Sequence, residues 1–444
     1  MTTDLTPSDS YQALLKKKIS ERSAVIGIVG LGYVGQPLTL RFAEEGFKVL
    51  GFDISDERVA ELNTGFSSIE HISNQRLLAA VSSGSEFTTE MSRAAEVDVL
   101  VLCLPTPLKN AREPDLSFVL NTLDALLPFL RRGQALSLES TTYPGTTTDE
   151  LAPRVSGIGL NIGEDFFLIY SPEREDPGNQ EFTTQEIPKI VSGFSAACLE
   201  VAEDLYGAIV EKAVSVSSPA VAEMTKLLEN TYRAINIGLA NEMKLVADQL
   251  GLDIFEVIDA AATKPFGFAA YYPGPGIGGH CIPIDPYYLS WKAKLAGVDT
   301  RFIELAGEVN RAMPGFVIAK LENALAQFNK QLFASNILVL GLAYKKNVDD
   351  VRESPAVEII HCLSEAGCHV AYSDPHVDTF PVMRKYHYQL TSEAINPSNL
   401  ESADAVIIAT DHDAFDFEMV LAHSKCIVDA RGVYRANFPN VYRA

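Results

Sequence analysis

The chain of 444 residues is too long for one ordinary domain, so two or three domains are expected. Hydrophobic residues make up 47% of it and charged residues 21%, which is typical of a soluble globular protein with sizeable cores. A formal net charge of −22 at pH 7 argues against nucleic acid or an anionic membrane surface as a partner, because the phosphate groups would be repelled.

The six cysteines form no Cys-x-x-Cys pair and are sparse for the length of the chain. This usage predicts a reducing compartment and no disulfide framework, and no zinc-ligand spacing is present. No apolar run is long enough to span a membrane, and the first residues carry charges where a secretory signal would be apolar. We therefore expect a cytoplasmic location and no metal, and we interpret residues 1–23 as an N-terminal arm or short amphipathic helix without chemistry.

A nucleotide-binding motif follows the first apolar run. Residues 24–29 predict a buried parallel strand that leads into Gly30-Leu31-Gly32-Tyr33-Val34-Gly35 and then into a helical pattern. In this GxGxxG motif Gly30 permits a tight turn and Gly32 lets a pyrophosphate approach the backbone, while Gly35 lets the helix pack on the strand.

A carboxylate completes this motif. The second predicted strand, residues 48–52, ends at Asp53, about 20 residues beyond the motif, where an acid binds the ribose hydroxyls of NAD and repels the 2′-phosphate of NADP. The strand, the glycines and the acid together predict an NAD-binding domain over residues 24–216.

Polar loops follow the next predicted strands of this domain. Residues 98–104 run into Pro105-Thr106-Pro107, and residues 135–139 run into a Ser/Thr-rich loop that contains Thr141. Ligands of open parallel sheets bind beyond the carboxyl ends of the strands, so we expect these loops at the cofactor and substrate cleft. The run Ser171-Pro172-Glu173-Arg174 follows another strand, and on its own it suits a solvated turn.

Residues 219–250 predict one long helix with apolar residues spaced by three and four, followed by Gly251. Such a helix suits a link between domains and a subunit interface. Lys226 and Asn230 lie one turn apart on a different face, where they either point together into a cleft or form a solvated strip. Further helices are expected at 254–262, 287–296 and 303–328, the last with an interruption left open at Pro314, so that residues 217–328 form a helical linker.

Residues 329–444 repeat the alternation of strands and helices, with strands expected near 335–341, 370–372, 405–409 and 426–429. The first turn of this unit lacks GxGxxG, so no second dinucleotide is expected, but Lys345, Lys346 and Arg352 suit a nucleotide diphosphate. We interpret His376 and residues 411–413 as surface polar residues. The predicted fold class is α/β, with two Rossmann-like, doubly wound parallel-sheet domains joined by a long central helix and a helical region.

One cysteine lies inside a run of glycines and prolines, Pro273-Gly274-Pro275-Gly276-Ile277-Gly278-Gly279-His280-Cys281-Ile282-Pro283-Ile284-Asp285-Pro286. This composition excludes a helix or strand and lets another molecule approach the backbone. Considered alone, the run is either a surface loop with an inert thiol or a loop whose thiol meets a ligand.

Taken in chain order, the motifs GLGYVG, PTP, ESTTYPGTT, SPERE, KLLEN, GPGIGGHCIPIDP and GLAYKKNVDDVRESP resemble those of the UDP-sugar 6-dehydrogenases. The resemblance runs from Ala24 to the C-terminus. It implies the oxidation of C6 of a hexose to a carboxylate with two NAD⁺. The sequence around Cys281 is similar to that of the branch acting on UDP-N-acetylglucosamine in polysaccharide synthesis.

The resemblance also implies roles for single residues. Cys281 matches the nucleophile that forms a thiohemiacetal and then a thioester, and Lys226, Asn230 and Asp285 match the groups that orient water and stabilise the oxyanion. Glu173 matches the carboxylate that assists hydrolysis of the thioester, and Thr141 matches a threonine that positions a water. The implied substrate contacts are Glu173, Arg174, Lys226, Asn230, Gly278, Gly279 and Lys345. The implied cofactor contacts are Gly30, Gly32, Tyr33, Val34, Gly35, Asp53, Pro105, Thr106, Thr141 and Arg352.

Two positions depart from the UDP-glucose branch: Ile284 replaces a lysine, and Pro177 replaces a glutamate. Both favour a different hexose. UDP-N-acetylmannosamine, UDP-N-acetylgalactosamine and UDP-glucose remain alternatives, as do a hydroxyacid dehydrogenase with a single hydride transfer and an inactive nucleotide-sugar sensor. The apolar stripe of the long helix predicts a homodimer or a higher homo-oligomer.

Overall fold

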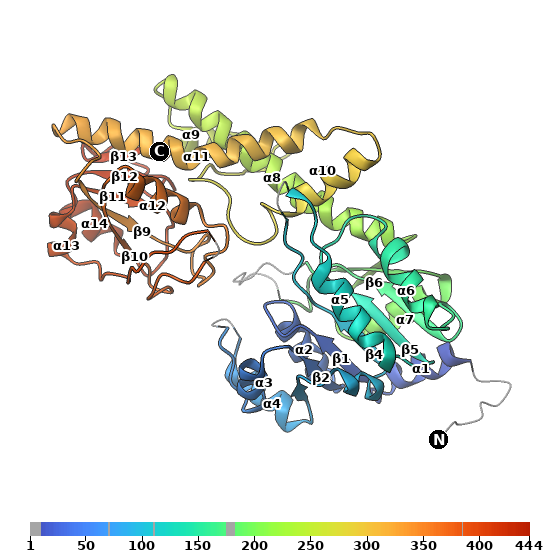
Figure 1. Ribbon diagram of the computed structural model, residues 1–444. Helices are drawn as coiled ribbons and strands as arrows, with labels where there is room; N and C mark the ends of the chain where they lie inside the picture. Colours follow the sequence, from blue (N-terminus) through green and yellow to red (C-terminus); the bar gives the residue numbers. More distant parts are fainter. Residues whose placement is uncertain (1–9, 70–71, 110–111, 175–182, 384) are drawn as a thin grey trace. The chain divides into compact units, whose positions relative to one another are not determined.

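The computed structural model describes residues 10–69, 72–109, 112–174, 183–383 and 385–444 (Figure 1). The chain forms two compact units. The first comprises Met1–Glu229 and Tyr287–Val298, and the second comprises Asn230–Pro286 and Asp299–Ala444. The long helix α8, Pro219–Gln249, begins in the first unit and ends in the second. Among the described residues, no helix combines the length and the apolar character needed to cross a bilayer.

The first unit is built around a sheet with the strand order β3-β2-β1-β4-β5-β6-β7-β8. Its first six strands pair in parallel in the doubly wound order, and β7 runs antiparallel to β6. The strands are β1 Val25–Val29, β2 Lys48–Phe52, β3 Glu86–Thr88, β4 Val99–Leu102, β5 Gln134–Leu138, β6 Phe166–Tyr170, β7 Lys189–Gly193 and β8 Ala213–Ser215. The helices are α1 Tyr11–Ser20, α2 Gly35–Glu44, α3 Asp56–Asn63, α4 Asn74–Ser82, α5 Ser117–Leu126, α6 Ala152–Gly157, α7 Ala196–Gly207 and α10 Asp285–Leu295, with short helical turns at Met91–Glu96, Leu127–Phe129 and Thr146–Leu151.

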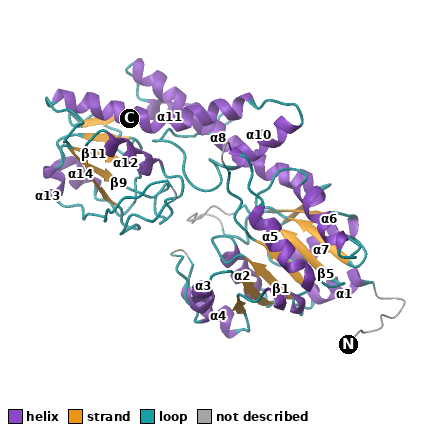
Figure 2. Ribbon diagram, viewed as in Figure 1, coloured by secondary structure: helices purple, strands orange, loops and turns teal. Residues whose placement is uncertain are grey.

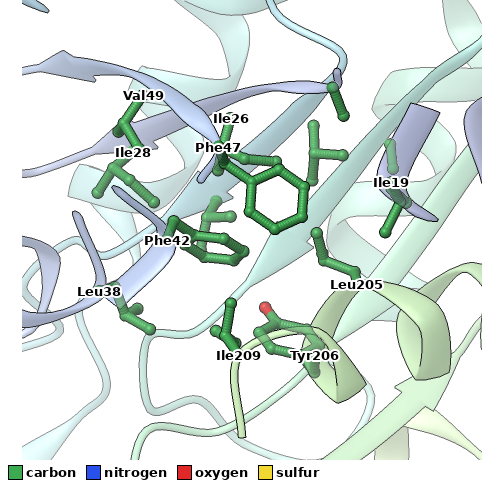
Figure 3. Packing of buried hydrophobic residues seen from close by; sticks show 14 of the residues in the cluster. Ile19, Ile26, Ile28, Leu38, Phe42, Phe47, Val49, Leu205, Tyr206 and Ile209 are labelled. Carbon is green, nitrogen blue, oxygen red and sulfur yellow. The ribbon is translucent and has the colours of Figure 1, made fainter. Parts of the chain in front are cut away.

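Helices cover both faces of this sheet, and alternate strand residues face each layer. On one face Ile26 and Ile28 pack with α1, α2 and α7, where Phe42 and Leu205 complete the cluster (Figure 3). On the other face neighbouring strand residues pack with α5 and α6. Burying each such large side chain contributes about 1.5–3 kcal/mol, so the two layers fix the strand ends that carry the polar loops.

The second unit holds a smaller, wholly parallel sheet with the order β10-β9-β11-β12-β13. Figure 2 draws its strands in orange and the helices in purple. Its strands are β9 Asn336–Leu340, β10 His369–Ser373, β11 Ala405–Ile408, β12 Ile427–Asp429 and β13 Val441–Arg443. Its helices, besides most of α8, are α9 Ile254–Ala262, α11 Arg301–Gln327, α12 Pro355–Glu365, α13 Pro397–Ser402 and α14 Phe417–His423. Helices α11 and α12 pack on one face of the sheet, and α13 and α14 pack on the other.

The predicted fold class is confirmed: two parallel-sheet α/β domains and a long central helix are present. The first twenty or so residues were expected to form a short amphipathic helix or an arm, and residues 11–20 form the helix α1, whose Leu15 and Ile19 are buried in the first core. The interruption left open at Pro314 is absent, because α11 continues through that residue. The short strands β3, β7, β8 and β13 were not predicted, since three to five residues give little periodicity.

Candidate functional site

The glycine loop between β1 and α2 has the geometry that its motif requires. Gly30 has φ +94°, and a Cβ there would lie 2.4 Å from the carbonyl oxygen of Cys103. A Cβ on Gly35 would lie 1.9 Å from the carbonyl oxygen of Gly30, so the helix and the loop are in direct backbone contact. A Cβ on Gly32 would meet no atom of the described residues within 4 Å. Open space therefore remains at the glycine where a pyrophosphate approaches.

Asp53 closes this loop from the end of β2. Its carboxylate accepts hydrogen bonds from the backbone N–H of Leu31 at 2.9 Å and of Ser55 at 3.0 Å. Val34, before α2, makes no side-chain cap; Gln36 donates its N–H to the carbonyl oxygen of Gly32 at 3.1 Å, and Pro37 has no N–H. These features fit a dinucleotide. Arg58, which the sequence analysis did not single out, lies with Nη1 3.2 Å from the Asp53 carboxylate.

Two loops at the carboxyl end of the same sheet are tied together. The hydroxyl of Ser140 accepts a hydrogen bond from the N–H of Leu104 at 2.8 Å, which joins the loop of Pro105 and Thr106 to the loop of Thr141. Thr106 is buried and Thr141 is half-buried. These predicted contact residues therefore lie on loops that the sheet itself positions.

Glu223 of α8 holds the rest of the Ser/Thr-rich loop. Its carboxylate accepts hydrogen bonds from Gly145 N–H at 2.6 Å and from the N–H and hydroxyl of Thr147 at 2.9 and 2.7 Å. Burial raises the pKa of Glu223, and the hydrogen bonds from Thr147 oppose that rise. Since Lys226 lies one turn further on, α8 connects this loop to a predicted catalytic lysine. Sequence reasoning missed Glu223, because nothing in the local pattern identifies its distant partners.

Glu173, Arg174 and Lys226 are gathered in the first unit. The ammonium of Lys226 donates to the carbonyl oxygen of Glu173. Arg174 forms a two-armed ion pair with Glu229 of α8, with distances of 2.6 and 3.3 Å. The Glu173 carboxylate lies 3.3 Å from the ammonium of Lys189. The loop is therefore a fixed, charged structure up to Arg174, and Pro177 lies outside the described residues.

Cys281, Asp285 and Asn230 are gathered in the second unit. All six cysteines of the chain lie in described residues, and only Cys281 is exposed. The N–H of Asp285 donates to the carbonyl oxygen of Cys281 at 2.8 Å, and Asn230 Nδ2 donates to the Asp285 carboxylate at 2.6 Å. Asn230 and Asp285 are both buried. The exposed thiol thus has a fixed carboxylate and amide one helical turn away.

The glycines before Cys281 pack tightly against the C-terminal part of the second unit. A Cβ on Gly278 would lie 2.5 Å from Tyr344 Cβ and 2.9 Å from the carbonyl oxygen of Glu353. The N–H of Gly279, which has φ +88°, donates to the carbonyl oxygen of Arg352 at 2.8 Å. Close packing within the unit is therefore a sufficient reason for both glycines, and the N–H of Gly279 is already bonded to protein.

His280 is a neutral neighbour of the thiol. Burial, aided by the positive charge of Arg352, lowers the pKa of His280 to about 4. Near pH 7 the imidazole therefore offers no positive charge to Cys281.

Folding is expected to weaken in acid because of His280. Between its unfolded pKa of about 6.5 and its folded pKa of about 4, the unfolded chain binds the proton first. The free energy of unfolding should therefore fall by up to about 3 kcal/mol as the pH drops through this window. Urea denaturation at several pH values measures this loss. The loss of unfolding free energy in acid should be smaller in His280→Gln and unchanged in His387→Gln, whose imidazole is exposed. Equal pH slopes of the unfolding free energy in the wild type and His280→Gln would contradict this prediction.

Lys345 lies in a loop that a hydrogen bond to His412 stabilises. Asn347 donates its N–H to His412 Nδ1 at 3.0 Å, and His412 Nε2 lies 3.1 Å from the Asp374 carboxylate. His412 is fully buried, so its interpretation as a surface polar residue is wrong. The sequence could not show this, since Asp374 and His412 are joined only by the fold. Arg352, expected at the cofactor, forms a two-armed ion pair with Asp350, with contacts of 2.6 to 3.0 Å.

Arg431 is a candidate binding residue that sequence reasoning missed. It follows β12, its Nε donates to the carbonyl oxygen of Ala409 at 2.7 Å, and a Cβ on Gly274 would lie 3.0 Å from its Nη1. No carboxylate of the described residues forms an ion pair with it. Burial lowers its pKa, and the charges of Asp411 and Asp429 oppose that change. A half-buried guanidinium in this setting suits an anionic ligand. Its place directly after a strand end was the available signal.

The predicted site residues thus fall into two groups. The first unit holds Gly30, Gly32, Tyr33, Val34, Gly35, Asp53, Pro105, Thr106, Thr141, Glu173, Arg174 and Lys226, and the second holds Asn230, Gly278, Gly279, Cys281, Asp285, Lys345 and Arg352. Lys226 and Asn230, four residues apart on the unbroken helix α8, stand at the junction of the two groups. No group of three or more His, Cys, Asp and Glu side chains suited to a metal ion occurs in the part of the chain that is described.

Three models of one protein family match the chain in order. They are the NAD binding domain, the central domain and the UDP binding domain of the UDP-glucose/GDP-mannose dehydrogenase family, over residues 24–210, 220–312 and 338–436. The resemblance found from the motifs, and the NAD cofactor inferred from the glycine loop, are thereby confirmed.

Curated relatives and a solved structure agree with these models. A UDP-N-acetyl-D-mannosamine dehydrogenase of Pyrococcus horikoshii is 35% identical over 419 residues, which cover 92% of this chain and 96% of the relative. A UDP-N-acetyl-D-glucosamine 6-dehydrogenase of Pseudomonas aeruginosa is 34% identical over 395 residues, which cover 88% and 91%. The structure of a UDP-D-ManNAc dehydrogenase from Pyrococcus horikoshii matches with a TM-score of 0.85 at 33% identity and covers 94% of this chain and 98% of its own. The chain therefore belongs to the UDP-glucose/GDP-mannose dehydrogenase family.

Proposed function

We propose that this protein oxidises C6 of UDP-N-acetylglucosamine to the uronic acid in two NAD-dependent steps, through a covalent intermediate on Cys281. The observation that carries the proposal is the exposed thiol of Cys281 in a rigid glycine loop, with the bonded pair Asn230 and Asp285 one turn away. A thiol in this setting can trap an aldehyde, which would otherwise leave between the two oxidations.

The residues of the chain divide the work as follows. Bound NAD⁺ supplies the hydride acceptor for each oxidation. The sulfur of Cys281 bonds to the C6 aldehyde as a thiohemiacetal and is held as a thioester after the second oxidation. Lys226 and Asn230 stabilise the oxyanion on C6, and Asp285 orients Asn230 and water; the burial of all three strengthens these interactions. Glu173 accepts a proton from the water that hydrolyses the thioester, and Thr141 positions that water.

The ligand contacts follow the domain plan expected from the sequence. Residues 24–216 bind NAD through Gly30, Gly32, Tyr33, Val34, Gly35, Asp53, Pro105, Thr106 and Thr141, with Arg352 contributing to the cofactor phosphates. Residues 217–328 form the helical linker, and residues 329–444 bind the UDP part. There Lys345 contacts the diphosphate, and we add Arg431, whose half-buried guanidinium has no ion-pair partner among the described residues. Glu173, Arg174, Gly278 and Gly279 complete the contacts to the sugar.

Two moles of NADH per mole of sugar are the expected yield, because the oxidation of an alcohol to a carboxylate removes four electrons. Absorbance of NADH at the end point, with limiting UDP-N-acetylglucosamine, measures it. A yield of one would instead support a hydroxyacid dehydrogenase without a covalent step. No NADH with any UDP-sugar, despite NAD binding, would support an inactive sensor.

Initial rates of NADH formation on four UDP-sugars should favour UDP-N-acetylglucosamine. The relatives named above act on N-acetylated sugars according to their names, and they divide between the glucosamine and mannosamine forms. UDP-N-acetylmannosamine is therefore the second candidate, followed by UDP-N-acetylgalactosamine. A clear preference for UDP-glucose would overturn the assignment to the N-acetylated branch.

We also propose that two copies associate through α8 and the helical region. The apolar stripe of α8 is exposed in the single chain: Leu228, Leu239 and Val246 are 57%, 54% and 46% exposed. Apolar side chains at helical spacing over such a length mark an interaction surface, and a second copy offers the same stripe. Light scattering should give the mass of a dimer, and Leu239→Lys should shift it toward the monomer. A monomeric wild-type chain would remove this proposal.

A cytoplasmic location is proposed as well. All six cysteines are free thiols, which suits a reducing compartment, and NAD and UDP-sugars are cytoplasmic metabolites.

A further inference from the structure

A network of buried polar side chains contacts Glu173 in the first unit. Lys189 of β7 places its ammonium 3.3 Å from the Glu173 carboxylate and 2.8 Å from the carboxylate of Glu139, the residue after β5. Tyr206 of α7 donates its hydroxyl proton to Glu139 at 2.5 Å, and Ser137 bonds to the same hydroxyl at 2.7 Å. Glu139 is 1% exposed, Lys189 5% and Tyr206 not at all. The network therefore leads from a predicted catalytic base into the interior of the domain.

In this network one lysine, Lys189, forms ion pairs with two carboxylates. Burial alone would lower the pKa of Lys189, but Glu139 and Glu173 raise it, so the ammonium stays charged. Burial raises the pKa of Glu139 to about 7, with the negative charge of Glu173 adding to the rise and Lys189 opposing it. The nearby thiol of Cys103 stays neutral, because burial and the two carboxylates raise its pKa. The two carboxylates thus compete for a single buried cation.

The contacts of Glu173 show how this competition affects its ability to accept a proton. One oxygen of its carboxylate accepts the N–H of Arg174 at 2.6 Å, the other faces Lys189 at 3.3 Å, and Lys226 donates to its carbonyl oxygen. If Lys189 had no other partner, protonation of Glu173 would leave a buried ammonium uncompensated, which costs several kcal/mol. Glu173 would then be a poor proton acceptor.

We propose that Glu139 is a positioning residue for thioester hydrolysis, the buried counter-ion that keeps Lys189 paired while Glu173 takes up and releases a proton. This rests on the role proposed for Glu173. In the step concerned, the oxygen of water bonds to the thioester carbon, and the carbon–sulfur bond breaks with its electron pair left on Cys281. Glu173 accepts the proton released by the water and afterwards returns it to solvent. Lys189 pairs with Glu139 during the interval and with both carboxylates otherwise.

Stability alone does not account for the arrangement. A buried ion pair is on average no more stabilising than apolar side chains of the same size. The proposal therefore needs a measurement that a purely structural role would leave unchanged, and the pH dependence of hydrolysis is such a measurement.

The test is Glu139→Gln, with the decay of the covalent adduct on Cys281 followed by rapid quenching and intact mass across a range of pH. With Glu139 neutral, Lys189 acts on Glu173 alone and makes it a weaker base. Because Glu139 has a pKa of about 7, it is ionised in the wild type only toward alkaline pH. The rate of hydrolysis in Glu139→Gln should therefore fall about 3- to 10-fold on the alkaline plateau, so that adduct accumulates, and should approach the wild-type rate at lower pH. NAD binding and the first NADH should be unchanged.

Two further variants make the result decisive. Tyr206→Phe keeps all three charges but removes a hydrogen bond to Glu139, so it should lower the rate of hydrolysis by less, and it replaces Glu139→Gln should that variant not fold. Asp98→Asn is the matched control, because Asp98 is a buried carboxylate of the same sheet, paired with Lys18 at 2.8 Å and Arg131 at 3.0 Å. It should lower stability and leave the profile unchanged.

The outcomes separate this proposal from the proposed function. Glu173→Gln, measured in parallel, should stop decay of the adduct; an unchanged decay would remove Glu173 from the mechanism. If Glu173→Gln blocks decay but Glu139→Gln or Tyr206→Phe keeps the wild-type pH profile, the counter-ion role is wrong and the proposed function stands. A loss of rate of equal size in Asp98→Asn would reduce the effect to general destabilisation and would also overturn the counter-ion role.

Discussion

Replacing Cys281 by serine is expected to abolish turnover, with kcat at least about 10³-fold below that of the wild type. A serine hydroxyl is far less acidic than a thiol and forms an oxygen ester, so neither the trapping of the aldehyde nor the release of the acid proceeds as with sulfur. NADH formation over a long assay measures the loss. The fold should be unaffected, because the side chain is exposed and the two residues differ by one atom.

The controls for this variant separate chemistry from binding. NAD binding to Cys281→Ser should equal that of the wild type, since the glycine loop and Asp53 lie in the first unit and Cys281 lies in the second. Cys362→Ser alters a half-buried thiol of the second unit on α12 and should leave the rate unchanged. A Cys281→Ser enzyme with an unaffected rate would exclude a covalent step through this residue.

Features fixed by local pattern could be predicted from the sequence. The strand, the glycine loop and Asp53 lie within 30 residues, and their geometry follows from turn sterics and helix packing. The bounds of α8 and α9 were predicted to within one residue for the same reason, since periodicity and the flanking Pro219 and Gly251 mark the ends.

Features that depend on distant contacts could not be predicted. The glycines before Cys281 pack on Tyr344 and Glu353, and Glu139 finds its partners 50 and 67 residues away in Lys189 and Tyr206. His412 resembles a surface residue until Asp374 is placed beside it. Partners at such separations are joined only by the topology of the sheets, which one sequence without its fold does not provide.

The faces of α8 illustrate an intermediate case. Periodicity correctly separated the stripe of Leu228 from that of Lys226 and Asn230, but it could not say which stripe faces the protein. In the structure Lys226 and Asn230 are buried and Leu228 is exposed, which inverts the usual burial of an amphipathic helix. The buried polar stripe holds two of the predicted site residues, and the apolar stripe of Leu228 is exposed in the single chain.

Alanine at two glycines of the nucleotide motif is expected to have opposite effects. At Gly35 the new Cβ would lie 1.9 Å from the carbonyl oxygen of Gly30, and neither backbone can move without separating α2 from β1. Gly35→Ala should lower the free energy of unfolding by more than about 3 kcal/mol and abolish NAD binding as a consequence. Thermal and urea denaturation without ligand measure the first effect.

At Gly32 the same substitution should leave folding intact. Its Cβ would meet no atom of the described residues within 4 Å, and the backbone there is not in the left-handed region, so the melting temperature should equal that of the wild type. The methyl group would occupy the space through which a pyrophosphate approaches, and the Kd for NAD should rise about 10- to 100-fold. Gly207→Ala, on an open and exposed helix end, is the matched control and should change neither quantity. Wild-type NAD affinity in Gly32→Ala would mean that the pyrophosphate lies elsewhere. Weakened binding at an unchanged melting temperature would place it at this glycine, because no atom of the described residues is there to clash with the added carbon.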